Sequence, residues 1–440
     1  MAITIAHKIE LRPNNKQKTY FRKAFGCARL AYNWGLEEWE RRYKAGEPRN
    51  AIAINNAFNA IKKERFPFVY EVSKYACQKS FSDLAEGYSM YYKKLGNRPK
   101  FKRKKEGEGS FYLSGDRIRV TYINENSKTL KKMKHNEKQK HQYIKVPKLG
   151  CVRMAECLRM NGKIQNARIT EHGGRFYASF TIEITEQEYQ RTHKTPQRKR
   201  SVGIDLGLKH TLILSNGISI DSPKPLRKNE RKLKRLSRQL DKRTHARTKQ
   251  ERLQGVKASN NYRKLNKRIS KLHCRIANIR KDFTNKVTSA LVATYGNIVI
   301  ETLNTQGLTK NHRLAKSLTD VSFGMIKRQL EWKCAHSGVT LTKASRWYPS
   351  SKTCSQCGNI KKVLTLDDRI YHCDCCGAEL DRDYNAALNL LSLTRDNSIG
   401  TVHPEFTPAD LTALLSLFLK NGLTTSKVET GNLTLANFAK

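Results

Sequence analysis

The amino-acid sequence predicts a mixed α/β protein built from several domains. The chain has 440 residues, more than one hydrophobic core usually organises, and 38% of them are apolar, as in a globular protein. Its N-terminal region alternates in polarity like β-strands but contains a long helical stretch. In its second half, strands and helices follow one another around a cluster of cysteines. These observations together predict at least two structural units.

The chain is strongly basic. It contains 85 Lys and Arg residues against 38 Asp and Glu residues, a formal net charge of +47. Mixed charges would keep a surface soluble equally well, so this excess indicates a polyanionic partner, first of all nucleic acid. A membrane surface is the alternative, but the sequence has no long apolar run and no secretory signal. We therefore expect a cytoplasmic protein that does not associate with a membrane.

The first 195 residues are expected to form a β-rich module interrupted by helices. The β module comprises residues 1–15 and 96–195, and the helical insertion comprises residues 16–95. The first strand of the module would be the N-terminus of the chain itself. A hairpin is predicted around His172-Gly173-Gly174, because two alternating segments flank that turn.

The second half has the element order of an RNase H-like domain. A basic linker at residues 193–201 leads to three predicted strands, a long basic helical stretch, a strand, a helix, a strand, an insertion and a final helix. This core is assigned to residues 200–345 and 381–394, and the insertion to residues 346–380. Residues 395–440 form a tail with one amphipathic helix, whose role the sequence does not indicate.

The long basic stretch is expected to fold as an antiparallel helical hairpin. Apolar residues recur at helical spacing in its first arm, at Leu226, Leu233, Leu236 and Leu240. The second arm keeps this rhythm from Leu265 to Val287, and Gly255 lies between the arms. A structural hairpin accounts for the apolar seam, but its outward residues are nearly all Lys or Arg rather than of mixed sign. We expect both functions, with the seam inside and phosphate-facing charge outside.

A cysteine cluster within the insertion predicts a metal site. Cys354-x2-Cys357 and Cys373-x2-Cys376 are fifteen residues apart, and a glycine directly follows each pair. This spacing allows two turns to bring four thiolates together around zinc. Four protein ligands leave no open position, so we expect a structural zinc ion. Cys375 could compete as a ligand, but the glycine after Cys376 favours Cys376.

Three carboxylates occupy the ends of predicted strands or helices. Asp205 lies in "GIDLG", Glu301 ends "IVIE", and Asp383 opens the last helix. Each has an ordinary explanation by itself: a turn carboxylate, a strand-end surface residue and a helix N-cap, for which Asp381 is equally suitable. In an RNase H-like sheet the first strand, the fourth strand and the last helix meet at one edge, so all three would converge. Converging carboxylates repel one another unless cations lie between them, which predicts two Mg²⁺ ions and a nuclease activity.

Four segments, in this order, resemble the TnpB family: "SVGIDLGLKHTLILSNG", "IVIETLN", "YPSSKTCSQCG" and "DRDYNAALNLL". The N-terminal "LRPNNKQKTYFRKAFGCARLAYNW" is similar to the opening of that family. TnpB proteins are transposon-associated, RNA-guided DNA endonucleases related to type V CRISPR effectors. The resemblance implies that Asp205, Glu301 and Asp383 are RuvC-type catalytic acids that bind Mg²⁺. It also implies zinc ligands at Cys354, Cys357, Cys373 and Cys376.

The resemblance further implies the architecture and the partners. The β module would be a wedge-like β-barrel with an inserted helical recognition domain, followed by a RuvC-like domain with an inserted zinc ribbon. The partners would be a guide RNA derived from the transposon end, one protein per RNA, and double-stranded DNA cut beside a short motif in a prokaryotic nucleoid. The alternatives are an unguided RuvC-like resolvase or transposase nuclease, and an RNA-guided DNA-binding regulator in which catalysis is unimportant. A zinc-ribbon scaffold that binds RNA is a further alternative.

Overall fold

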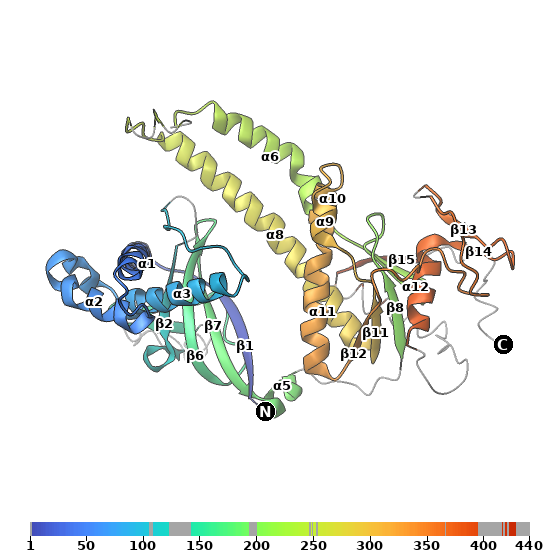
Figure 1. The fold of residues 1–440 in the computed structure, drawn as a ribbon, viewed down its shortest axis with the longest axis horizontal. Helices are drawn as coiled ribbons and strands as arrows, with labels where there is room; N and C mark the ends of the chain where they lie inside the picture. Colours follow the sequence, from blue (N-terminus) through green and yellow to red (C-terminus); the bar gives the residue numbers. More distant parts are fainter. Residues whose placement is uncertain are drawn as a thin grey trace, which may run out of the picture. The chain divides into compact units, whose positions relative to one another are not determined.

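The structure is a computed structural model of the chain, and it divides into two compact units, Met1–Thr192 and His193–Lys440 (Figure 1). It describes residues 2–104, 109–122, 142–192, 200–245, 248, 250–251, 254–365, 367–394, 416, 419 and 422–427. The linker expected at residues 193–201 lies mostly outside these ranges, as does most of the amphipathic helix expected in the tail. In the described parts of the chain, none of the helices combines the length and the apolar character needed to cross a membrane.

Two antiparallel sheets form the β part of the first unit. Their strand orders are β1-β7-β6-β2 and β3-β4-β5, and a bridge between Leu11 and Met154 links them. The strands are β1 (Ala2–Leu11), β2 (Ser110–Ser114), β3 (Arg119–Thr121), β4 (Tyr143–Val146), β5 (Gly150–Arg153), β6 (Lys163–His172) and β7 (Arg175–Thr185). The hairpin predicted around Gly173 and Gly174 is confirmed as the β6–β7 pair. β1 pairs with β7 along its whole length, so the N-terminus does provide a strand of this sheet.

The helices predicted between β1 and β2 are confirmed. They are α1 (Asn15–Lys44), α2 (Ala51–Arg65) and α3 (Tyr75–Tyr92), and short helical segments are η1 (Pro67–Glu71), η2 (Gly115–Arg117) and α5 (Glu186–Thr192). Phe21 of α1 packs against Phe111 of β2 and Phe176 of β7, with ring centres 5.9 and 5.4 Å apart. The helices and the larger sheet therefore share one hydrophobic core.

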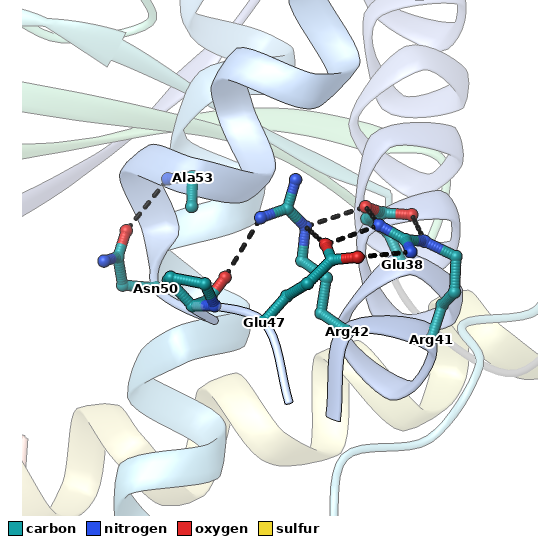
Figure 2. A network of polar contacts seen from close by, with 7 residues as sticks. Glu38, Arg41, Arg42, Glu47, Asn50 and Ala53 are labelled. Atoms are coloured by element: carbon teal, nitrogen blue, oxygen red, sulfur yellow. Dashed lines mark hydrogen bonds and ion pairs between the residues drawn. The ribbon is translucent and has the colours of Figure 1, made fainter. Parts of the chain in front are cut away.

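A network of charged side chains joins the end of α1 to the turn before α2 (Figure 2). Glu38 accepts hydrogen bonds from Arg41 and Arg42, at 2.8 and 2.7 Å, and Arg41 also donates to Glu47 at 2.8 Å. The Asn50 side chain then caps α2. The side chain of Arg41 is 52% exposed, so its ion pairs contribute little stability. The side chains of Glu38 and Arg42 are only 13% and 17% exposed, and this pair is less screened by water. The network therefore connects the end of α1 with Glu47 in the turn that leads to α2.

The second unit is built on a six-stranded sheet of order β12-β11-β8-β9-β10-β15. Its strands are β8 (Ser201–Asp205), β9 (Leu212–Leu214), β10 (Ile218–Asp221), β11 (Asn297–Ile300), β12 (Thr340–Lys343) and β15 (Thr424–Lys427). β8, β11 and β12 are parallel, and the remaining pairs are antiparallel. The strand order along the chain agrees with the RNase H-like prediction. β15 was not predicted, and it places residues 424–427 at the edge of the sheet beside β10.

Helices cover both faces of this sheet (Figure 1). They are α6 (Pro225–Asp241), α8 (Asn260–Thr294), α9 (Thr305–Thr309), α10 (Ala315–Val321), α11 (Phe323–Ser337) and α12 (Arg382–Ser392). Because side chains alternate along a strand, Val202 and Ile204 pack with α8 and α11 on one face, whereas Gly203 faces α12 on the other. The same alternation places Val299 of β11 on the α12 face.

The predicted helical hairpin is present as α6 and α8, with its seam of leucines and isoleucines buried between the arms. Its base is held by Asp320, a buried residue of α10. The Asp320 carboxylate accepts hydrogen bonds from the backbone N–H groups of Leu226 and Arg227, at 2.8 and 2.9 Å. These are unpaired donors in the first turn of α6, so the carboxylate acts as a cap supplied from another helix.

Candidate active site and metal centre

The three predicted carboxylates come from elements that meet at one edge of the six-stranded sheet. Ile204 of β8 pairs with Ile300 of β11, so Asp205 at the end of β8 and Glu301 directly after β11 lie at the same edge. Asp205 shares its sheet face with Gly203, which is the face that α12 covers. Asp383 lies in the first turn of α12. The structure therefore brings the three side chains together, while their catalytic role stays a prediction.

Gly203 sets how closely α12 approaches β8. A Cβ atom on Gly203 would lie 2.1 Å from the carbonyl oxygen of Ala387 and 2.5 Å from the backbone nitrogen of Leu391. Both atoms belong to the backbone of α12, which cannot move aside as a side chain can. Glycine is thus required at this point, and it determines the spacing between the strand that carries Asp205 and the helix that carries Asp383.

Asp381, and not Asp383, caps the N-terminus of α12. The Asp381 carboxylate accepts hydrogen bonds from the backbone N–H groups of Asp383 and Tyr384, at 3.0 and 2.9 Å. From the sequence, Asp381 and Asp383 were equally suitable caps, and the structure shows that Asp381 is the cap. The Asp383 carboxylate is instead contacted by the guanidinium group of Arg382, whose Nε lies 3.0 Å from Oδ1. Asp383 is therefore not needed for capping.

Asp205 and Glu301 lie in an environment that disfavours their negative charge. Asp205 is 8% exposed. Burial, together with the charges of Glu301 and Asp383, raises the pKa of Asp205 well above its ordinary value. Burial also raises the pKa of Glu301 to about 7, although the N–H of Leu206 donates to its carboxylate at 3.0 Å. A cation bound at this edge would stabilise the charged forms of Asp205 and Glu301.

The donor set at this edge fits Mg²⁺, because carboxylate oxygens are the hard ligands that this ion prefers. The three side chains do not form as compact a group as the cysteines, which are the one such cluster of potential ligands among the described residues. The backbone N–H of Leu206 donates a hydrogen bond to the Glu301 carboxylate, and the guanidinium group of Arg382 donates one to the Asp383 carboxylate. Arg382 also lowers the pKa of Asp205 against the larger effects of burial and of the acidic neighbours.

The four cysteines chosen from the sequence lie together in a small ribbon built on β13 (Ile370–His372) and β14 (Glu379–Asp381). The sulfur atoms of Cys354, Cys357, Cys373 and Cys376 all lie within 4.8 Å of one another. Two of the separations are 3.6 and 3.5 Å. Tetrahedral zinc with Zn–S bonds of about 2.3 Å needs sulfur atoms about 3.8 Å apart. The cluster therefore fits a structural zinc ion.

The two halves of the cluster repeat the same turn. Gly358 donates its N–H to the carbonyl of Cys354 at 2.9 Å, and Gly377 donates to Cys373 at 3.0 Å; both glycines have positive φ, 76° and 67°. Cys375 is exposed and does not belong to the four-sulfur group. Backbone N–H groups, first that of Cys376 and then that of Cys375, lower the pKa of the Cys373 thiol to about 6. Cys375 thus contributes its backbone rather than its thiol.

Two buried asparagines of α12, which the sequence reasoning missed, attach this ribbon to the helix that carries Asp383. The Asn385 side chain donates to the carbonyl of Thr353 at 2.7 Å and accepts from the N–H of Ser355 at 2.9 Å. Asn389 donates to the carbonyls of Ser350 and Thr353, at 2.7 and 2.6 Å. The signal in the sequence was an Asn pair at i, i+4 within an otherwise apolar helix face. The pair holds the entry to the ribbon in place relative to Asp383.

Comparison with known families gives three matches along the chain. Residues 180–312 match a family described as "Probable transposase" (OrfB_IS605), and residues 323–390 match "Cas12f1-like, TNB domain". Residues 1–48 match a "Helix-turn-helix domain" associated with the first family. In this structure that last segment consists of β1 and the single long helix α1 rather than two helices.

Similar proteins extend over most of the chain. A Streptomyces pristinaespiralis protein described as "Putative RNA-guided DNA endonuclease" is 29% identical over 391 residues, 88% of either chain. The Escherichia coli K12 protein "Putative RNA-guided DNA endonuclease InsQ" is 27% identical over 409 residues, covering 88% of this chain and 91% of that protein. "TnpB-like protein L79" of Acanthamoeba polyphaga mimivirus is 30% identical over 232 residues, 50% of this chain and 41% of that protein.

Proposed function

We propose that this chain, which belongs to the TnpB family, is an RNA-guided endonuclease that cuts double-stranded DNA. One observation carries the proposal: Asp205 is buried beside Glu301 and Asp383 at one edge of an RNase H-like sheet, where their charges disfavour one another. The net charge of +47 provides for a nucleic-acid partner. Two relatives that match most of the chain have RNA-guided DNA endonuclease in their names.

The chemistry would be hydrolysis of a phosphodiester bond. Two Mg²⁺ ions bound by the three carboxylates would activate a water molecule and stabilise the charge that develops on the phosphate. Asp205, Glu301 and Asp383 would be the side chains that hold these ions. Arg382, which now contacts Asp383, offsets part of the acidic charge at this edge. This single site would cut the two DNA strands in turn.

The other parts of the chain would hold the nucleic acids. We infer that the sheets of residues 1–15 and 96–195 act as a wedge-like barrel and that helices in residues 16–95 form a recognition domain. The guide RNA would come from the transposon end, with one protein per RNA. Base pairing with that RNA would read the target sequence beside a short DNA motif, at the nucleoid. The zinc ion would be structural, because four thiolates complete its coordination.

The first test is the RNA that co-purifies with the protein expressed from its native locus. The proposal expects one discrete RNA that ends in a segment matching the flanking DNA. Heterogeneous cellular RNA that salt removes would instead favour the unguided nuclease.

The second test is the variant Asp205→Ala, which should keep RNA and DNA binding but abolish cleavage in Mg²⁺. Asp282→Ala is the matched control, because Asp282 is an exposed carboxylate of α8 paired only on the helix surface with Lys286 at 2.9 Å. Cleavage by the Asp205 variant at the control's rate would refute the assignment of the catalytic acids.

A further inference from the structure

A cavity of about 230 Å³ opens beside Glu301, at the ends of the parallel strands β11 and β12. Its walls come from residues 301–304 after β11 and from the loop after β12, and Leu390 of α12 lines another side. Crevices beyond the carboxyl ends of parallel strands are where open α/β sheets bind their ligands. If Glu301 acts at the cleaved phosphate, this cavity is the space next to the cut.

The loop after β12 carries Trp347, which is 82% exposed, the highest value among the large hydrophobic residues in the described parts of the chain. Most exposed apolar side chains on a protein surface need no explanation. An exposed indole ring is less common, because it leaves more apolar area in contact with water than almost any other side chain would. The two neighbours of Trp347 in the chain, Arg346 and Tyr348, both line the cavity.

The loop is fixed on both sides of Trp347. Before it, the backbone N–H of Ala344 donates to the carbonyl of Ile300 at 2.9 Å, which ties the loop to the sheet. After it, the Tyr348 hydroxyl donates to the carbonyl of Asn389 at 3.0 Å, which ties the loop to α12. The backbone on both sides of the ring is therefore fixed while the ring itself faces solvent. A ligand that binds here would lose little free energy to ordering the loop.

Arg346 connects Trp347 to the cavity. Its guanidinium carbon lies 5.1 Å from the centre of the Trp347 ring, and the same residue lines the cavity together with Glu301. A guanidinium group can stack on an aromatic ring while it donates hydrogen bonds to a phosphate. The pair therefore offers an aromatic face and a phosphate-binding group side by side, next to the candidate catalytic carboxylate.

We propose that Arg346 and Trp347 form a positioning clamp for the DNA strand being cut. Trp347 stacks on a nucleobase close to the cleaved bond, and Arg346 contacts a phosphate of the same strand. A nucleobase is the occupant that the surroundings favour, because the site combines an aromatic face with a cation in a chain of net charge +47. Stacking is tolerant of sequence, which suits an enzyme whose target is read by base pairing. The inference rests on the proposed nuclease function.

The test uses the full chain bound to its RNA, and measures single-turnover cleavage of a matching DNA duplex. Trp347→Ala should slow cleavage by roughly 5- to 150-fold, the range expected for loss of one base–aromatic stack. Trp347→Phe should keep most of the rate because it keeps an aromatic face. The control is Trp332→Ala in α11, which removes a ring that is 42% exposed and belongs to neither the cavity nor the loop. Melting temperatures establish that the variants are folded.

A cross-linking measurement reads the contact directly. A single-stranded oligonucleotide with 5-iododeoxyuridine at one position is irradiated with the protein, and the attached residue is identified by mass spectrometry. The proposal expects attachment at Trp347, and loss of this product in Trp347→Ala. Cleavage by Trp347→Ala at the wild-type rate would overturn the clamp, and so would a wild-type protein without cross-linking at this residue. A change of oligomeric state in Trp347→Ala, measured by sedimentation, would overturn it in favour of a protein contact.

The two proposals fail in different ways. If the wild-type complex does not cut any matching duplex, the nuclease proposal fails, and the cross-link at Trp347 alone decides whether this residue binds single-stranded DNA. If the wild-type complex cuts and Trp347→Ala cuts equally fast, the nuclease proposal stands and the clamp is refuted.

Discussion

Substitution of Gly203 by alanine should separate the two halves of the candidate active site. The new Cβ would lie 2.1 Å from the carbonyl oxygen of Ala387, whereas real Cβ atoms essentially never approach another heavy atom closer than 3.0 Å. The helix α12 must therefore move away from β8 by at least about 1 Å. Overpacking of this kind costs about 1–3 kcal/mol, less about 0.5–1 kcal/mol regained because alanine restricts the unfolded chain. Asp383 would move with the helix.

The displacement should affect cleavage more strongly than folding, because a misplacement of about 1 Å in a catalytic constellation can reduce the rate about 100-fold. Urea unfolding gives the stability, and single-turnover cleavage at saturating Mg²⁺ gives the rate. Gly324→Ala in α11 is the matched control: its Cβ would lie 3.7 Å from Thr305 Oγ1, an ordinary contact. If Gly203→Ala matched this control in both stability and rate, the close approach of β8 and α12 would have no part in positioning the carboxylates.

Three further predictions concern the cap, the zinc site and a buried lysine. Asp381→Ala should lower the free energy of unfolding by about 1 kcal/mol, because it removes the acceptor for the N–H groups in the first turn of α12. Asp381→Asn should lower it by much less, because the amide oxygen can still accept these hydrogen bonds. Equal urea midpoints for the two variants would contradict this prediction. Cys375→Ser should retain one zinc per chain by atomic absorption, whereas Cys376→Ser should lose it and destabilise the ribbon; the opposite pattern would make Cys375 the ligand. Burial lowers the pKa of Lys333 from 10.5 to about 8, so the unfolded chain binds more protons between these values and the stability contribution of this residue should rise from pH 8 to pH 10.5. The urea midpoint of Lys333→Met should not show this rise over the same pH range. If the wild-type protein and Lys333→Met had the same pH profile, the three hydrogen bonds donated by the Lys333 ammonium group would offset the effect of burial on its pKa.

Local patterns in the sequence predicted most of the helices and strands of the two units and nominated the candidate site residues. The paired C-x-x-C-G turns predicted Cys354, Cys357, Cys373 and Cys376, because the ligand spacing of such a turn depends on only a few consecutive residues. Asp205 and Glu301 stood out as carboxylates at the ends of apolar strands, and the strand order then predicted that they would meet. The apolar seam of the α6–α8 hairpin followed in the same way from its helical spacing.

The tertiary structure decided what depends on contacts between distant residues. Whether Asp381 or Asp383 caps α12 could not be read from their order, because either side chain could reach the first turn. The need for glycine at position 203 arises from a helix almost two hundred residues later in the chain. The strand β15 at the sheet edge was likewise invisible, because its pairing with β10 spans about the same distance in sequence.

The loop beside the candidate active site shows the same division. In the sequence, Arg346 and Trp347 are an unremarked pair between a strand and a cysteine turn. Only the fold shows that Arg346 lines the cavity with Glu301, and that hydrogen bonds from Ala344 and Tyr348 anchor the loop on both sides of an exposed ring. The sequence by itself thus identified the candidate metal ligands and acidic residues. The tertiary structure decided which of these residues face one another, because their contacts join segments that are far apart in the chain and share no local sequence pattern.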